Sequence, residues 1–162
     1  MDIHIREYFE TDYEYLQDFL VKLNKYIMSL DPNKKICTSK DYKDVYTNEL
    51  LKSTKENDGI IYIAKSNNYC VGMIAGIIEK YSVVDNTHYK NNKEGRILEL
   101  FVEENYRREN IGKKLMEKME EYFKEHGCDF LLVDVFEYNK VAKEFYKKSG
   151  YNARNIEMGK KI

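Results

Sequence analysis

The sequence predicts an α/β domain in which helices cover both faces of a mixed sheet. Three observations lead to this prediction. Strand-like and helix-like patterns alternate along the chain in the order β-α-α-β-β-β-α-β-α-β. Residues 130–136 form a near-continuous apolar run, which is typical of a strand covered on both faces. The length of 162 residues suits one domain, so we expect residues 1–162 to fold as a single unit.

The first half of the chain is expected to hold one strand, two helices and a hairpin. Ile3 and Ile5 alternate with polar residues, which indicates a strand. Two later segments repeat apolar residues at helical spacing, and Pro32 follows the first of them. The other predicted elements are a helix over residues 11–29, a helix over about 39–53, and a hairpin of strands 60–65 and 69–79.

The second half begins with a long polar segment, residues 84–94, and then alternates strands with helices. The polar segment is expected to be a long loop, or a strand end followed by a loop, and such loops are often functional. Gly127 and Gly150 mark the ends of two helices. The predicted elements are a strand over 96–102, a helix over 111–126, a strand over 130–136, a helix over 139–149 and a weakly alternating last strand within 151–162.

Charge and cysteine content exclude several classes of protein. Lys and Arg number 27, Asp and Glu number 28, and the net charge of −1 argues against general nucleic-acid binding. Cys37, Cys70 and Cys128 lie far apart and form no metal-binding motif, and free thiols suit the cytoplasm. The first residues lack the apolar core of a signal peptide, and no apolar run is long enough to span a membrane.

The most informative segment is the one that leads from residue 98 to residue 115. An apolar strand, Leu98 to Val102, is followed by a basic turn, and an amphipathic helix then starts at Ile111. The first N–H groups of a helix have no partner inside the helix, and the helix dipole adds positive potential there. This segment is therefore a candidate site for an anionic phosphate group.

Two motifs in this half resemble the acetyl-CoA-binding half of the GNAT N-acetyltransferase superfamily. In that family, a strand that ends in Val is followed by x-Pro-x-Tyr, and then by Arg-Gly-x-Gly-x-Gly at the start of a helix. In this chain four residues match that pattern at the same spacing: Val102, Tyr106, Arg107 and Gly112. The second block is Asn-x-x-Ala-x-x-Phe-Tyr-x-Lys-x-Gly-Tyr. Its matches are Asn139, Ala142, Phe145, Tyr146, Lys148, Gly150 and Tyr151. The resemblance implies a GNAT-type fold with a mixed, mostly antiparallel central sheet.

The first motif departs from the family pattern at two glycines, whose positions hold Arg108 and Asn110, and at the proline, which is Glu104. Glycine serves there for positive φ and for close approach of the backbone to pyrophosphate. Asn tolerates the left-handed region better than other non-glycine residues, so Asn110 is expected to hold the same turn. Arg108 is expected to add a positive charge beside the phosphates.

The resemblance implies acetyl-CoA as a co-substrate. Backbone N–H groups from Arg107 to Lys113 would hold its pyrophosphate, and the residues concerned are Arg107, Arg108, Asn110, Ile111, Gly112 and Lys113. The backbone of Phe101 and Val102 would pair with the pantetheine arm like an added strand. Asn139 would bind the arm from the other side. The alternative for Asn139 is an N-cap of the last helix, and the two roles are compatible.

Tyr146 is the candidate catalytic acid, because the family commonly assigns this Tyr the proton or hydrogen bond donated to the departing thiolate. The alternative is a core Tyr beside Phe145. Glu99 and Asp134 are candidate bases, since each interrupts an apolar strand and burial would raise its pKa. Glu99 is slightly favoured, although a bulge in its strand would change the face that it occupies. The alternatives are that each carboxylate is paired with Arg96, or that a water chain acts as the base in place of both.

These residues predict an N-acetyltransferase that moves acetyl from acetyl-CoA to a primary amine. Direct attack in a ternary complex is expected, since no cysteine lies at a site suited to an acyl-enzyme. The alternatives are a GNAT-like CoA-binding sensor without turnover and an interaction domain without a cofactor. The acceptor is expected to be a small-molecule or peptide amine, bound between the N-terminal helices and residues 84–94. Neither nucleic acid nor membrane is an expected partner, and homodimers are common among such proteins.

Overall fold

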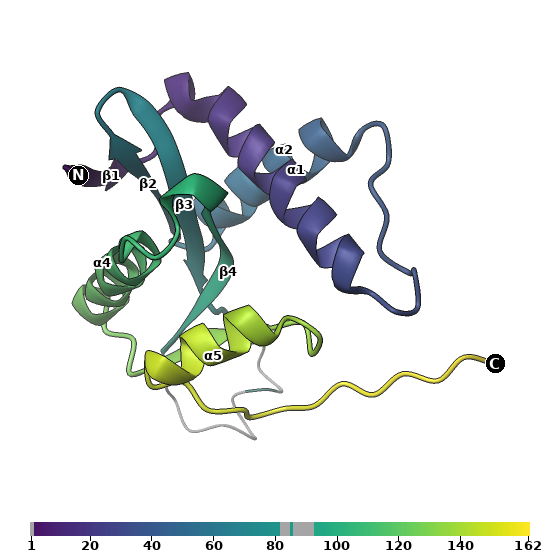
Figure 1. The fold of residues 1–162 in the computed structure, drawn as a ribbon. Helices are drawn as coiled ribbons and strands as arrows, with labels where there is room; N and C mark the ends of the chain where they lie inside the picture. Colours follow the sequence, from purple (N-terminus) through teal and green to yellow (C-terminus); the bar gives the residue numbers. More distant parts are fainter. Residues whose placement is uncertain (1, 82–84, 86–92) are drawn as a thin grey trace.

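Five strands form one mixed sheet in the computed structural model, which describes residues 2–81, 85 and 93–162 (Figure 1). The strands lie in the order of the chain, and all neighbours are antiparallel except β4 and β5, which are parallel. The prediction of a mostly antiparallel mixed sheet is confirmed. The strands are β1 (Ile3–Glu7), β2 (Ile60–Ser66), β3 (Tyr69–Ile78), β4 (Glu94–Val102) and β5 (Phe130–Val133).

Helices cover both faces of the sheet, as the sequence predicts (Figure 1). Two helices, α1 (Tyr13–Leu30) and α2 (Tyr42–Glu56), lie on one face, and α4 (Ile111–Glu125) lies on the other. The short helix α5 (Lys140–Lys148) lies beside the end of the sheet that β4 and β5 form. Single 3-10 turns, η1 (Glu10–Asp12) and η2 (Glu104–Tyr106), come before α1 and α4. No described helix is long and apolar enough to cross a membrane.

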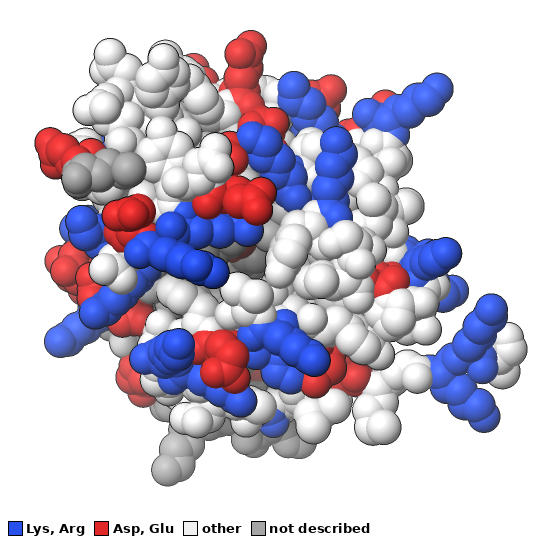
Figure 2. Space-filling model, viewed as in Figure 1, with Lys and Arg blue, Asp and Glu red and all other residues white. Residues whose placement is uncertain are grey.

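Acidic and basic side chains are intermixed over the surface seen in Figure 2. No single sign of charge covers this face, in agreement with the nearly equal numbers of acidic and basic residues in the chain. Local charges, rather than a broad field, must therefore select any charged ligand on this face.

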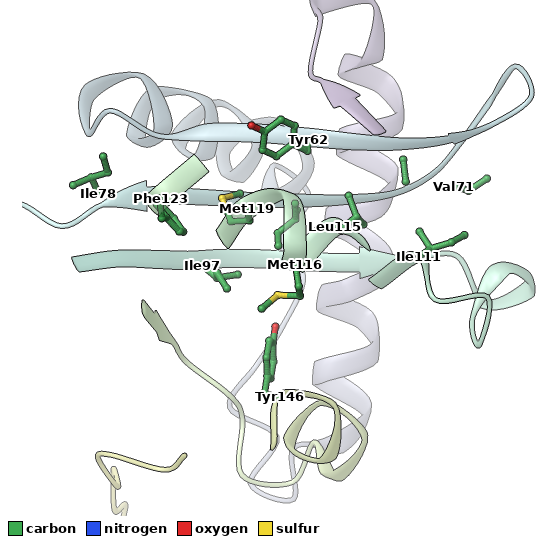
Figure 3. Close-up of a cluster of buried hydrophobic side chains, with 12 residues drawn as sticks. Tyr62, Val71, Ile78, Ile97, Ile111, Leu115, Met116, Met119, Phe123 and Tyr146 are labelled. Carbon is green, nitrogen blue, oxygen red and sulfur yellow. The ribbon is translucent and has the colours of Figure 1, made fainter. Parts of the chain in front are cut away.

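The sheet separates two apolar clusters. Side chains alternate along β2, so Tyr62 packs toward α4 and Ile63 packs toward α1 and α2. The α4-side cluster, drawn in Figure 3, includes Ile97, Leu115, Met119, Phe123 and Tyr146. The cluster on the other face includes Leu16, Phe19, Leu50, Met73 and Phe101. β4 contributes to both clusters and so connects the two faces.

Two glycines allow α4 to lie close to the sheet. A Cβ atom at Gly95 would meet the Phe123 ring at 2.6 Å, and one at Gly76 would meet its Cζ atom at 2.7 Å. Phe123 is fully buried at this point. The aromatic ring thus takes the space that two side chains would occupy, which fixes α4 relative to β4.

Three sequence predictions need correction or fall outside the description. The predicted last strand is wrong, because residues 151–162 have no regular structure, and Ile156 and Met158 are 85% and 90% exposed. The tail therefore buries too little apolar surface to hold a strand in place. β5 ends at Val133 rather than residue 136, and it is an edge strand with Phe130 exposed instead of one covered on both faces. The 84–94 segment lies mostly outside the described residues.

Candidate active site

Glu99 faces the N-terminal helices because β4 contains a bulge. The pairing of β3 with β4 shifts between Ala75 and Gly76, which leaves Leu98 as an extra residue on β4. A bulge of this kind reverses the alternation of faces beyond it. Glu99 therefore lies on the α2 side, where the Tyr46 hydroxyl group donates a hydrogen bond to Glu99 Oε1.

The surroundings of the Glu99 carboxyl group raise its pKa toward neutrality. Burial raises its pKa from 4.5 to about 7, because the low-polarity surroundings disfavour the charged form. The hydrogen bond from Tyr46 stabilises the carboxylate and so opposes this rise in pKa. A carboxyl group in this state can accept and release a proton near neutral pH, as a general base must.

Tyr146 lies on α5 with its hydroxyl group directed toward β4 (Figure 3). Its ring is 9% exposed and packs edge-on against Phe145 and Tyr151, with centroids 5.3 and 5.7 Å away. Burial, followed by the negative charge of Glu99, raises the pKa of Tyr146 well above its usual range. The phenol therefore stays protonated and can act as a donor close to Glu99.

Asp134 does not join this pair. It follows the last residue of β5, its side chain is 91% exposed, and its Oδ2 atom lies 2.7 Å from Arg96 Nη1. This is the ion pair that the sequence left open as the alternative to a catalytic role. The structure thus leaves Asp134 on the surface, whereas Glu99 lies near enough to Tyr146 for its charge to raise the pKa of that phenol.

β4 and β5 separate just where Glu99 lies. Their parallel pairing runs only from Glu94 and Phe130 to Ile97 and Val133. The remaining part of β4, from Leu98 onward, has no partner strand on that side among the described residues. Such an open edge can pair with an extended ligand by backbone hydrogen bonds.

The two residues expected along this edge occupy different surroundings. Phe101 is buried against Phe19, with ring centroids 5.2 Å apart, so its backbone is firmly held. The Val102 carbonyl oxygen accepts a hydrogen bond from Arg107 Nε at 3.0 Å. The Arg107 guanidinium group also lies 6.0 Å from the ring centroid of Tyr26, which places α1 beside the same edge.

Asn139 caps α5 at the other side of the gap. Its Oδ1 atom accepts a hydrogen bond from the Ala142 N–H group at 3.1 Å, and the Tyr26 hydroxyl group lies 3.5 Å from the same oxygen. The N-cap role proposed for Asn139 is thus present. Its side-chain amide N–H groups are the donors available for a ligand.

The turn between β4 and α4 takes the conformation that glycines would adopt. Arg108 has φ 68° and Asn110 has φ 58°, so both non-glycine residues stand in the left-handed region. The prediction for Asn110 is confirmed, and Arg108 takes the same type of conformation at a cost of about 1–2 kcal/mol. The turn therefore keeps its shape without its first two glycines.

The start of α4 presents free backbone donors. The first helical hydrogen bond runs from Lys114 N–H to the Asn110 carbonyl oxygen at 3.0 Å, and the Asn110 side chain caps none of the earlier N–H groups. The N–H groups of Ile111, Gly112 and Lys113 therefore lack partners inside the helix. Arg107 differs from the prediction, because its N–H group already donates to the Glu104 carbonyl oxygen at 3.2 Å. The described residues contain no cluster suited to a metal ion.

Sequence reasoning missed Tyr42 and Tyr46. Both lie on the apolar side of α2, so their spacing indicated packing alone. Their rings stack with centroids 5.0 Å apart and planes at 11°. Only the bulge at Leu98, which the sequence does not reveal, turns Glu99 toward them.

The family model described as the acetyltransferase (GNAT) family matches residues 23–151 of this chain. A glucosamine 6-phosphate N-acetyltransferase from Arabidopsis thaliana is 34% identical over 68 residues, which is 42% of this chain and 44% of that protein. This chain thus matches less than half the length of that relative. The crystal structure of the enzyme of that name from the same plant has a TM-score of 0.67 at 21% identity, covering 100% of this chain and 99% of that chain.

Other solved structures share the fold. A mutant of the BH1408 protein from Bacillus halodurans has a TM-score of 0.85 at 18% identity, covering 98% of this chain and 99% of that one. AAC(6')-Iy in complex with the bisubstrate analogue CoA-S-monomethyl-acetylneamine has a TM-score of 0.69 at 16% identity, covering 100% of both chains.

Proposed function

The chain belongs to the acetyltransferase (GNAT) family, and we propose that it transfers the acetyl group of acetyl-CoA to a primary amine. The burial of Glu99 beside the open edge of β4, with its charge acting on the Tyr146 phenol, carries this proposal. One group can accept a proton and the other can donate one. Attack of an amine on a thioester requires both.

Acetyl-CoA fits the donors and the open edge beside this pair. The N–H groups at the start of α4 would bind its pyrophosphate, aided by the charges of Arg107 and Arg108. The edge of β4 at Phe101 and Val102 would pair with the pantetheine arm, and Asn139 would bind the arm from α5. The structure of AAC(6')-Iy with a CoA-containing bisubstrate analogue supports a CoA site in this fold.

The reaction proposed is direct attack. Glu99 accepts a proton from the acceptor ammonium, and the freed amine nitrogen attacks the thioester carbonyl carbon. A C–N bond forms and the C–S bond breaks, so that the thiolate leaves. The Tyr146 O–H group donates a proton or a hydrogen bond to the leaving sulfur. The nitrogen loses a second proton as the amide forms, and this proton reprotonates Tyr146 or passes to the thiolate, so that the products are the amide and the free thiol. Holding both reactants beside these groups supplies the orientation that a bimolecular reaction lacks.

Glu99 is the better candidate for the base than Asp134. Burial raises the pKa of Glu99 to about 7, whereas the exposed Asp134 forms an ion pair with Arg96.

Two measurements on the full chain test the proposal. Calorimetric titration with acetyl-CoA is expected to show binding, and addition of primary amines is expected to release free thiol while producing the acetylated amine. Binding without turnover of any amine would favour a CoA sensor instead. Absence of binding at millimolar acetyl-CoA would contradict the proposed function and favour an interaction domain.

A further inference from the structure

An aromatic surface leads to Glu99 from the side of the N-terminal helices. Tyr42 and Tyr46 lie one turn apart on α2 and stack in parallel, with ring centroids 5.0 Å apart. Tyr46 remains 36% exposed although its hydroxyl group is hydrogen-bonded to Glu99. Part of the Tyr46 side chain is therefore accessible to a ligand beside the carboxyl group.

The charge of Glu99 acts on the tyrosines of this surface. Burial, followed by the charge of Glu99, raises the pKa of Tyr42 to about 12. The same two causes raise the pKa values of Tyr46 and Tyr146 further. Tyr46 thus contacts this carboxyl group directly, and Tyr42 stacks on Tyr46 beside it. The faces of such rings are electron-rich, so rings and carboxylate together attract a cation.

We propose that Tyr42, Tyr46 and Glu99 form the acceptor subsite, and that this subsite takes a primary ammonium group on an apolar carbon skeleton. The inference rests on the proposed function and specifies its acceptor. The ammonium group would bind at Glu99, and its alkyl or aryl skeleton would lie against the two rings. A carboxylate or phosphate close to the amine would be repelled by Glu99 and by the electron-rich ring faces.

Tyr46 acts in this subsite as a positioning residue. Its hydroxyl group fixes the direction of the Glu99 carboxylate and keeps the pKa of that group from rising further. The titratable groups that act on Glu99, or on which it acts, are Tyr42 and Tyr46 on α2 and Tyr146 on α5. Loss of the Tyr46 hydroxyl group should therefore move the acid limb of the pH profile of kcat/KM to higher pH.

The substrate class is tested with matched acceptors and acetyl-CoA as the donor. Phenethylamine and phenylalaninamide carry no negative charge, whereas phenylalanine adds a carboxylate beside the amine. Glucosamine 6-phosphate, the substrate named for the Arabidopsis relative, adds a phosphate. We expect kcat/KM for the first two amines to exceed that for phenylalanine and glucosamine 6-phosphate by at least about tenfold, since like charges in a partly buried site repel strongly.

The possible outcomes separate this inference from the proposed function. Preference for phenylalanine or glucosamine 6-phosphate would overturn the inference and leave the acetyltransferase proposal intact. Turnover of no amine at all would overturn both.

Three variants test the residues. Tyr46→Phe should shift the acid limb upward by about half to one pH unit, the effect of one lost hydrogen bond to a carboxylate. Tyr42→Leu should raise KM for phenethylamine about three- to fivefold with little change in kcat. Tyr13→Phe is the matched control, because its hydroxyl group donates to Asn48 Oδ1 at 3.1 Å, and it should leave both quantities unchanged. An unchanged acid limb in Tyr46→Phe, with acetyl-CoA binding and folding intact, would refute the role of Tyr46.

Discussion

Glu99, the proposed base, carries a cost to stability. Its half-buried carboxyl group on β4 accepts one hydrogen bond, from Tyr46. A carboxylate withdrawn from water with so little compensation destabilises the folded state when it is ionised. Such a cost is common at functional sites, where activity and stability require different surroundings.

Glu99→Gln is expected to stabilise the protein at pH 8 and to have little effect at pH 4. The pKa of Glu99 rises from 4.5 to about 7 on folding, so folding takes up a proton between these values. Wild-type stability should therefore fall as pH rises from about 4.5 to 7, by at most roughly 3 kcal/mol. The glutamine stays neutral and can still accept the Tyr46 hydrogen bond. Urea unfolding at both pH values measures the difference, and an equal effect at pH 4 and pH 8 would exclude this explanation.

Tyr146→Phe is expected to lower kcat about a hundredfold, because the leaving sulfur loses its donor. Acetyl-CoA affinity should stay within about twofold, since the ring and its packing are retained. Steady-state kinetics and calorimetric titration measure the two quantities. Tyr138→Phe is the control, because Tyr138 precedes α5 and is 51% exposed. A Tyr146→Phe enzyme with unchanged kcat would contradict the donor role and show that Tyr146 serves only in the core.

Residue types and motif spacing predicted part of this site. Tyr146 and Asn139 could be found because they belong to a motif with fixed spacing on one helix. Tyr46 could not be found, because its partnership with Glu99 depends on a one-residue bulge in another strand. A bulge changes the face of a side chain without a clear mark in the sequence.

The turn between β4 and α4 is the element proposed to bind the pyrophosphate. Its shape is set by two left-handed residues rather than by glycines. Arg108 has no side-chain reason to prefer this conformation, whereas Asn110 tolerates it better.

Arg108→Gly is expected to increase the free energy of unfolding by about 0.5–1 kcal/mol, because glycine adopts φ 68° without strain. Greater freedom of the unfolded chain limits this gain. Chemical denaturation measures it, and Arg107→Gly, at a residue with φ −70°, serves as the comparison that should not stabilise. A destabilised Arg108→Gly protein would contradict the strain assigned to this turn.

Gly112→Ala is expected to preserve folding and to weaken acetyl-CoA binding by roughly tenfold or more. The added methyl group would lie 3.5 Å from the Phe145 ring, an ordinary contact, and alanine favours the helix. It would instead obstruct the approach of pyrophosphate to the backbone. Calorimetric titration measures the affinity. Gly159→Ala is the control, since a Cβ atom there meets nothing within 4 Å, and unchanged affinity in Gly112→Ala would argue against a pyrophosphate site at this turn.

Helices and strands with a strong apolar periodicity were predicted well, whereas the strands predicted at the edge of the sheet were not. α4 begins at Ile111, where the sequence predicts it, because its apolar stripe covers the sheet. The predicted last strand is absent because Ile156 and Met158 remain exposed. The weakly alternating apolar residues of the tail therefore bury no surface that would hold a strand in place. A periodic apolar pattern predicts a helix or strand only when the apolar face of that element packs against the rest of the protein.

The molecule as a whole has two sides that meet at β4. α4 and α5 frame the open edge and the turn proposed for acetyl-CoA, and α1 and α2 cover the opposite face with its aromatic surface (Figure 1). Glu99 lies where the two sides meet. This arrangement allows two reactants to approach one carboxyl group from different directions, as direct transfer requires.

The initial rate of thiol release from acetyl-CoA, measured against pH with and without a primary amine, tests the central proposal most directly. The account predicts amine-dependent release, with an acid limb in kcat/KM near pH 7 that disappears in Glu99→Gln. Thiol release that is independent of the amine, or a limb near pH 7 that persists in Glu99→Gln, would contradict it.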